Sequence, residues 1–200
     1  MTHPRFFTRS RTAALTVSLL AISLSVPPLR SLIEQSMWWH MVVQMPLLVL
    51  AGWLTMAAWQ RRSAPQFMAS WNVYGLNGFF LTFLILAYWM LPSAIDRAVV
   101  LPQADGLKLL MLFAAGALSK HAMDRSPAVL QLFFVALTLS MLIWLGVYFV
   151  TTELRLCNAY SLASQVSTGC GLIGLGIATG SVWLRHAALW RDQGRTTALN

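Results

Sequence analysis

Charge is what this sequence has least of: 14 residues are Lys or Arg and 6 are Asp or Glu, together 10% of its 200 residues. Soluble domains carry about 25% charged residues. Hydrophobic residues make up 58% of the chain, and the mean hydropathy is +0.64. This composition excludes an ordinary soluble globular domain. It predicts an all-α, polytopic integral membrane protein that crosses the lipid bilayer as a helical bundle.

Long polar segments are also missing, so the chain has no aqueous domain in which separate chemistry could take place. Phosphate-binding glycine loops and nucleophile–base motifs are missing as well. We therefore expect that the chain is not an enzyme. A bis-histidine haem needs two imidazoles at similar depth in the membrane. His40 and His121 are expected near opposite membrane faces, so they do not form such a site. Basic cytoplasmic loops explain the net charge of +8, so we expect no nucleic-acid partner.

Apolar segments of nearly membrane-spanning length recur along the chain. A transmembrane helix needs about 20 apolar residues. The sequence predicts one domain of about six spans, at residues 12–29, 37–59, 71–91, 101–118, 128–150 and 162–183. The first segment follows a basic stretch and ends at Pro27 and Pro28, so it also fits a cleavable signal peptide. We favour a retained first span.

The basic residues predict the orientation of these spans. With both termini in the cytoplasm, ten Lys and Arg residues fall on the cytoplasmic side and four (Arg30, Arg97, Lys108 and Arg155) on the outer side. This bias is typical of membrane proteins. We therefore expect a multi-pass protein of the bacterial inner membrane with both termini inside.

Cysteine is scarce, with two residues thirteen positions apart. Cys157 falls in the outer loop after the fifth span, and Cys170 falls within the sixth span. Helical rise separates them by more than the roughly 6 Å that a disulfide spans between Cα atoms. Cys157 is therefore a free thiol, a metal ligand or half of an intermolecular bridge, while Cys170 is expected to pack.

The start of the second span gathers polar and sulfur-containing side chains. On an α-helix, an arc of about 140° holds Met37, His40, Met41, Gln44 and Met45. Thioethers and an imidazole are ligand types that suit copper. The alternative is a packed helix face with one hydrogen-bonded histidine, whose partner is a backbone carbonyl, Asp96 or Glu153.

Three stretches together resemble the CtaG-type cytochrome c oxidase assembly factors. The first runs from Glu34 through His40-Met41 to Pro46-Leu47-Leu48, the second contains Asp96, and the third contains Cys157-Asn158. The resemblance implies a periplasm-facing role in copper delivery to a respiratory oxidase. The chain departs from the family pattern at Gln44, which replaces a second histidine, and in having six expected spans rather than seven.

The resulting hypothesis is a copper-handling assembly factor for a copper-containing oxidase. His40, Met37, Met41 and Cys157 are its candidate ligands, and Gln44, Asp96, Glu34 and Asn158 are expected around them. Asp96 would accept the second imidazole N–H, since ligating histidines usually donate it. The alternative is a non-catalytic accessory subunit that scaffolds a larger membrane complex. It is suggested by the small residues of the sixth span and by the incomplete ligand set on any one helix.

Overall fold

The computed structural model describes residues 4–26, 29–33, 35–60, 71–157 and 160–198, and every regular element in these ranges is helical. This confirms the all-α prediction. The elements in chain order are α1 (Pro4–Ser23), α2 (Leu29–Ile33), the π-helix η1 (Trp39–Gln44), α3 (Met45–Gln60), the 3₁₀ turn η2 (Val73–Gly75), α5 (Leu76–Trp89), α6 (Pro92–Val100), α7 (Pro102–Met123), α8 (Ala128–Thr151) and α9 (Leu162–Ala198).

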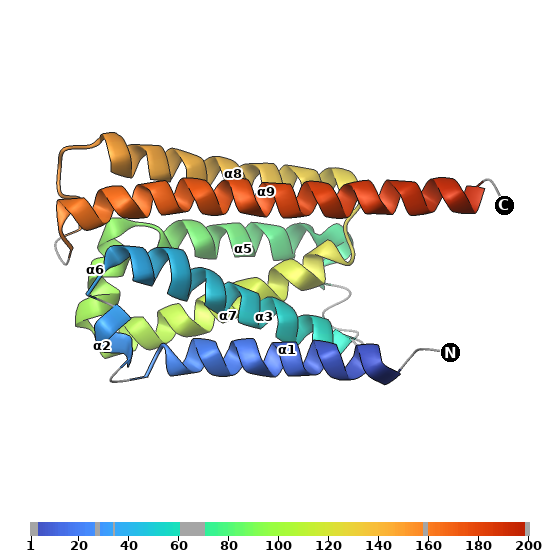
Figure 1. The fold of residues 1–200 in the computed structure, drawn as a ribbon, viewed down its shortest axis with the longest axis horizontal. Coiled ribbons are helices and arrows are strands. Elements are labelled where there is room, and N and C mark those ends of the chain that lie inside the picture. Colours follow the sequence, from blue (N-terminus) through green and yellow to red (C-terminus); the bar gives the residue numbers. More distant parts are fainter. Residues whose placement is uncertain (1–3, 27–28, 34, 61–70, 158–159, 199–200) are drawn as a thin grey trace.

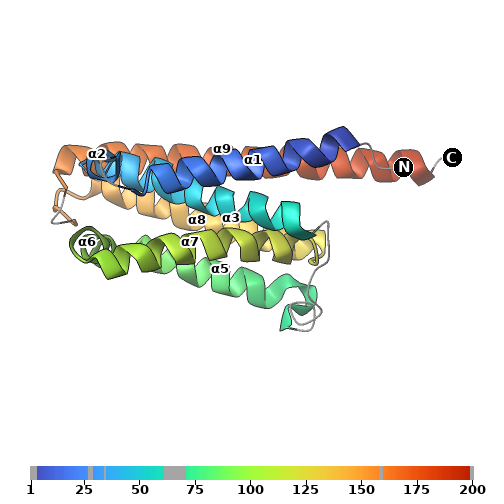
Figure 2. The ribbon, with the colours of Figure 1, turned by 90° about the horizontal axis from the view of Figure 1, so that it is seen from below.

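The long helices lie side by side and run roughly along one axis (Figures 1 and 2). Helix α3 packs against α1 and α7, and α7 packs in turn against α5 and α6. Helices α8 and α9 form an antiparallel hairpin, which meets the other helices through η1 and α5. One end of the molecule holds α2, η1, α6 and the start of α9, and we call it the α6 end. Helix α1 begins and α9 ends at the opposite end (Figure 1).

Three described helices are long and apolar enough to cross a membrane: Trp39–Trp59, Ala128–Thr151 and Leu162–Arg185. A fourth candidate is the pair Val73–Trp89 and Pro92–Val100, which is bent by 71° at its break. The chain is therefore a helical protein with several candidate membrane spans, as expected of a multi-pass protein that associates with a lipid bilayer. The prediction of six spans is wrong, because three to four of the helices in the described residues meet the requirement.

The expected first, third and fourth spans differ from the described helices for identifiable reasons. The described apolar part of α1, Thr12–Ser23, rises only about 18 Å at 1.5 Å per residue, which is short of a hydrocarbon core of about 30 Å. Helix α7 is long enough but carries Asp105, Lys108 and Lys120. The third segment ends in the bend before Pro92, where α6 starts in a new direction.

The expected α-helix over residues 37–59 also begins differently. Residues Trp39–Gln44 form a π-helix, and at its end the Met45 N–H donates to the His40 carbonyl five residues earlier. Such insertions are frequent at functional sites. Here the π-helix ends two residues before Pro46, which has no N–H to donate. The arc calculated for an α-helix therefore does not apply, yet the π-helix still buries His40, Met41 and Gln44.

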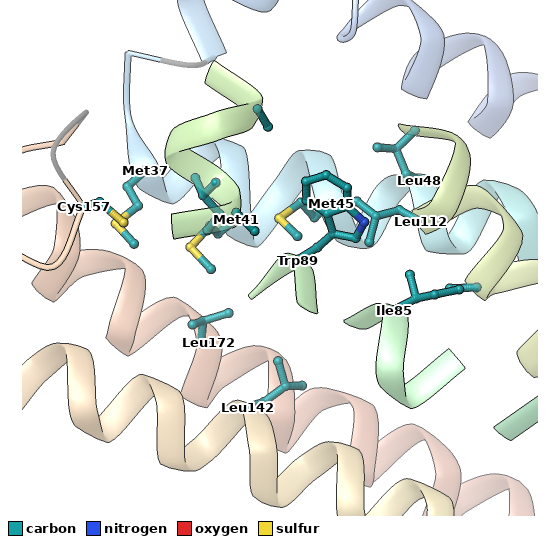
Figure 3. Packing of buried hydrophobic residues seen from close by; sticks show 14 of the residues in the cluster. Met37, Met41, Met45, Leu48, Ile85, Trp89, Leu112, Leu142, Cys157 and Leu172 are labelled. Carbon is teal, nitrogen blue, oxygen red and sulfur yellow. The ribbon is translucent and has the colours of Figure 1, made fainter. Parts of the chain in front are cut away.

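The main apolar core joins the hairpin to the other helices. Its methionine row, Met37, Met41 and Met45, is buried in one cluster with Trp89 of α5 and with Cys157. Figure 3 shows this row facing the labelled leucines of α7, α8 and α9. The sulfur atoms are therefore part of the packing that fixes the hairpin at the α6 end.

Candidate buried polar site at the α6 end

The centre of the candidate site is a contact between two fully buried side chains. The Lys108 Nζ lies 3.3 Å from the His40 Nε2, and both residues have 0% exposure. Lys108 comes from α7 and His40 from η1. An ammonium has only donors, so Nε2 accepts the hydrogen bond and Nδ1 carries the imidazole proton. The Nδ1 atom is buried without a hydrogen-bond partner among the described residues.

Acidic and basic side chains extend this contact across the α6 end. Asp105, one turn before Lys108 on α7, lies 2.6 Å from the Lys108 Nζ through Oδ1. Its Oδ2 lies 3.2 Å from an Arg30 guanidinium nitrogen, and Arg30 also donates to the Ala98 carbonyl at 3.5 Å. The polar network, defined as Arg30, Asp105, Lys108 and His40, thereby connects α2, α6, α7 and η1. Buried charges need such partners because an isolated ion is very costly to desolvate.

Gln44 has a role different from the expected one. Its Nε2 donates to the Leu24 carbonyl at 3.3 Å and to the Ser25 Oγ at 3.4 Å, while its Oε1 is buried without a partner among the described residues. Leu24 and Ser25 follow the end of α1. Gln44 therefore fixes the segment after α1 against η1.

The segment between α8 and α9 brings Cys157 to the same end. Gln165 of α9 is buried and holds this segment through both of its amide atoms. Its Oε1 accepts from the Leu156 N–H at 3.0 Å, and its Nε2 donates to the Leu154 carbonyl at 3.2 Å. Cys157 is thereby buried in one cluster with Met37 and Met41 (Figure 3). Three residues later, the Tyr160 ring lies 6.4 Å from the His40 ring.

The Cys157 thiol is protonated at neutral pH. Burial, with a smaller contribution from the negative charge of Asp96, raises the pKa of Cys157 to about 12. The thiol therefore needs a metal ion or another strong driving force to lose its proton. Cys170 is exposed on α9, so the expectation that it packs is wrong. Neither cysteine forms a disulfide, as the spacing of the two residues predicted.

Asp96 does not have the role predicted for it. The imidazole of His40 gives no hydrogen bond to Asp96, because Nε2 faces Lys108 and Nδ1 has no partner in the described part of the chain. Asp96 acts instead on the Cys157 thiol through its charge. Two further expected neighbours, Glu34 and Asn158, lie outside the described residues.

The candidate ligands fit copper unequally. The described residues contain no group of three or more His, Cys, Asp and Glu side chains that could hold a metal ion. The sulfur atoms of Met37, Met41 and Cys157 share one buried cluster, and soft sulfur ligands suit Cu(I). His40 does not fit in the observed arrangement, because the Lys108 ammonium lies at its Nε2. A soft-metal site here would therefore rest on sulfur.

Sequence reasoning missed Lys108 as the partner of His40. A signal was present, because Asp105 and Lys108 are spaced as one helical turn within an otherwise apolar stretch. Ionisable residues at such positions usually pair with one another or face a cavity. The spacing did not show that the His40 imidazole of η1 would lie next to the Lys108 ammonium.

Comparisons of the chain with protein-family models, curated proteins and solved structures give no match.

Proposed function

We propose that the chain handles Cu(I) at the α6 end and assists the assembly of a copper-containing respiratory oxidase in the bacterial inner membrane. The observation that carries the proposal is the burial of Met37, Met41 and Cys157 in one cluster. These residues come from two segments more than a hundred positions apart. In this proposal copper is cargo that the protein takes up and passes on.

The chemistry of the three sulfur atoms supports Cu(I) over harder ions. Thioethers are neutral, soft ligands that need no deprotonation, and thiols and thioethers both select Cu(I). Because the Cys157 thiol is protonated at neutral pH, its binding of copper would release a proton. A site of two thioethers and a thiol that resists ionisation suits a carrier, since weak ligands allow release to a partner.

The two ends of the molecule support the proposed orientation. The start of α1 and the end of α9 lie together at the end opposite α6 (Figures 1 and 2). Lys120, in the last turn of α7, and Arg125, in the turn between α7 and α8, belong to this end as well. An end rich in basic residues is expected in the cytoplasm, which would direct the α6 end to the periplasm.

Copper binding to the purified protein tests the proposal. Cu(I) is added under reducing conditions, and bound metal is measured by elemental analysis and by competition with a chromophoric chelator. We expect copper at a fixed stoichiometry in the wild type and its loss in the variant Met37→Leu/Met41→Leu/Cys157→Ser. Met56→Leu is the control, because Met56 is also buried on the same chain segment but lies towards the far end of α3.

The copper content of the three proteins either supports or contradicts copper handling. Copper bound by the wild type and by Met56→Leu, but not by the triple variant, supports the proposal. Equal copper in wild type and triple variant, or none in either, contradicts it, provided that circular dichroism shows all three proteins to be equally helical. Leu replaces Met with little change of volume, so the triple variant is expected to fold.

A second candidate function is that of an accessory subunit in a larger membrane complex. The observation that favours it is the hairpin of α8 and α9, whose apolar faces are mostly exposed while it contacts the other helices chiefly through η1 and α5. Such a face would suit lipid or a partner's helices. Purification in a mild detergent separates the two: a partner retained at fixed stoichiometry supports this function, and a stable lone monomer contradicts it.

A further inference from the structure

We infer that Lys108 controls access of a metal ion to His40, by holding its ammonium where a ligated ion would have to sit. As a description of copper loading this inference rests on the proposed function. As a description of the imidazole it rests only on contacts within the chain. Lys108 is thus a positioning residue, since it acts through His40 and touches no cargo itself.

The first part of the argument concerns Nε2. Its lone pair accepts a hydrogen bond from the Lys108 Nζ, 3.3 Å away. A metal ion bound to Nε2 would lie about 2.0 Å from that nitrogen, on the side that the ammonium occupies. Two cations would then be in contact in a fully buried setting, where like charges repel most strongly. Ligation through Nε2 therefore requires Lys108 to leave.

The second part concerns Nδ1, which has no hydrogen-bond partner among the described residues and at first sight is a free ligand. A neutral imidazole carries its proton on one nitrogen only. If Nδ1 gave its lone pair to a metal ion, the proton would move to Nε2 and would point at the Lys108 ammonium. Two donors would then face each other. Lys108 therefore opposes ligation at both nitrogens.

The third part concerns what keeps Lys108 in place. Its side chain has 0% exposure, and its Nζ lies 2.6 Å from the Asp105 carboxylate. Asp105 is in turn 3.2 Å from the Arg30 guanidinium. A lysine buried in this way holds its charge because its counter-ion is buried with it. His40 can therefore bind a metal ion only when this polar network rearranges. In this inference the sulfur atoms bind the copper ion before His40 does.

Nitrogen NMR of the protein labelled on histidine tests the inference without any metal. In the wild type we expect the His40 ring in the Nδ1–H tautomer, with Nε2 accepting a hydrogen bond. The signal is assigned as the one missing from His40→Ala. In Lys108→Met/Asp105→Asn, which removes one charge of each sign, we expect a changed Nε2 signal. The control is Lys120→Met, which removes the chain's other lysine from the far end of the same helix.

Metal affinity provides the second measurement, with Cu(I) as the probe. We expect His40→Ala to leave the affinity of the wild type unchanged. The neutral double variant should bind Cu(I) more tightly, by about tenfold or more. Residues that are hydrogen-bonded to a ligating imidazole change metal affinity by at least about this factor. Adding His40→Ala to the double variant should abolish the gain. Lys108→Arg, which keeps a cation at this position, should behave as the wild type.

The outcomes separate this inference from the proposed function. An Nε2–H tautomer in the wild type, or an unchanged His40 signal in the double variant, overturns the inference whatever copper does. Weaker copper binding by His40→Ala than by the wild type also overturns it, while leaving the proposed copper function standing. No copper bound by the wild type contradicts the proposed function, but leaves the NMR result to decide the role of Lys108.

Discussion

Gly52 of α3 and Gly116 of α7 lie where the backbones of these two helices touch. A Cβ added to Gly52 would be 1.9 Å from the Phe113 carbonyl oxygen, and one added to Gly116 would be 1.9 Å from the Val49 carbonyl oxygen. Small residues allow this close approach. Gly116 lies about two turns after Lys108, and Gly52 about two turns after Gln44. The crossing therefore holds α7 close to the segment that carries His40.

We expect Gly52→Ala and Gly116→Ala each to destabilise the fold, because a methyl group cannot fit against a backbone carbonyl without separating the helices. Overpacking of this kind typically costs about 1–3 kcal/mol. Thermal unfolding in detergent, followed by circular dichroism, measures the loss. Gly106→Ala is the matched control on α7, since a Cβ there has no neighbour within 4 Å. An equal melting temperature for Gly116→Ala and Gly106→Ala would contradict the close crossing.

Asp105 is expected to matter more for stability than Arg30. Asp105→Ala leaves the fully buried Lys108 ammonium without the carboxylate that lies 2.6 Å away, and breaking a buried pair in this way costs about 3–5 kcal/mol. Arg30 is partly exposed, with a side-chain exposure of 20%, so Arg30→Ala should cost less. Chemical unfolding of both variants in detergent measures which of them has the lower free energy of unfolding. The prediction fails if Arg30→Ala is the less stable protein.

The two cysteines should differ in their reaction with N-ethylmaleimide. Cys157 is buried, and with its pKa raised to about 12 only roughly one thiol in ten thousand is ionised at about pH 8. Cys170 is exposed. Mass spectrometry of the labelled protein should show the adduct at Cys170 under native conditions and at both cysteines after unfolding. The variant Cys170→Ser should stay unlabelled until it unfolds, and rapid labelling of that variant would contradict the burial of Cys157.

The end opposite α6 depends on a buried pair of side chains, Asn72 and His121. The Asn72 Oδ1 accepts from the Gly78 N–H at 2.9 Å, so its Nδ2 donates to the His121 Nδ1 at 3.0 Å. Asn72→Ala leaves both partners without this hydrogen bond, which costs about 1–3 kcal/mol. Asn77→Ala is the control, because Asn77 is exposed and bonds only to the Trp71 carbonyl in the described structure. Comparable losses in the two variants would contradict a special role for Asn72.

His121 should also make stability depend on pH. Burial first, and then the charge of Arg125, lower the pKa of His121, while Asp124 opposes them. Because the unfolded chain then takes up a proton more readily, at about pH 6.5, stability is greatest above that value and falls as the pH decreases. We expect this fall between about pH 8 and about pH 5.5 to be smaller in His121→Gln. Identical pH profiles of the two proteins would disprove this contribution.

Reporter fusions test the orientation of the chain. If both ends lie in the cytoplasm, a green fluorescent protein should fluoresce at either terminus, while alkaline phosphatase should be inactive there. A phosphatase inserted in the segment between α8 and α9 should be active, because that segment lies at the α6 end. Active phosphatase at the C-terminus would contradict the proposed direction of the α6 end.

The helical class of the chain follows from its apolar runs, but the number of spans does not. A hydropathy pattern records how apolar a segment is, and the segments of α1, α5 and α7 are all apolar. It does not record that the third segment bends by 71°, or that α7 buries Asp105 and Lys108 against other helices. Those features depend on contacts between segments that are distant in the sequence.

By itself, the sequence determined that this protein is an all-helical bundle with apolar helices long enough to cross a membrane. It also predicted that His40, the methionines and Cys157 lie on the same side of the bundle, because helix boundaries and charge bias sort residues by side, but it did not predict which of them are neighbours. The tertiary structure alone decided what His40 touches. The α3–α7 crossing and the π-helix η1 bring an ammonium to its Nε2, and a local pattern holds no information about a contact made across 68 residues.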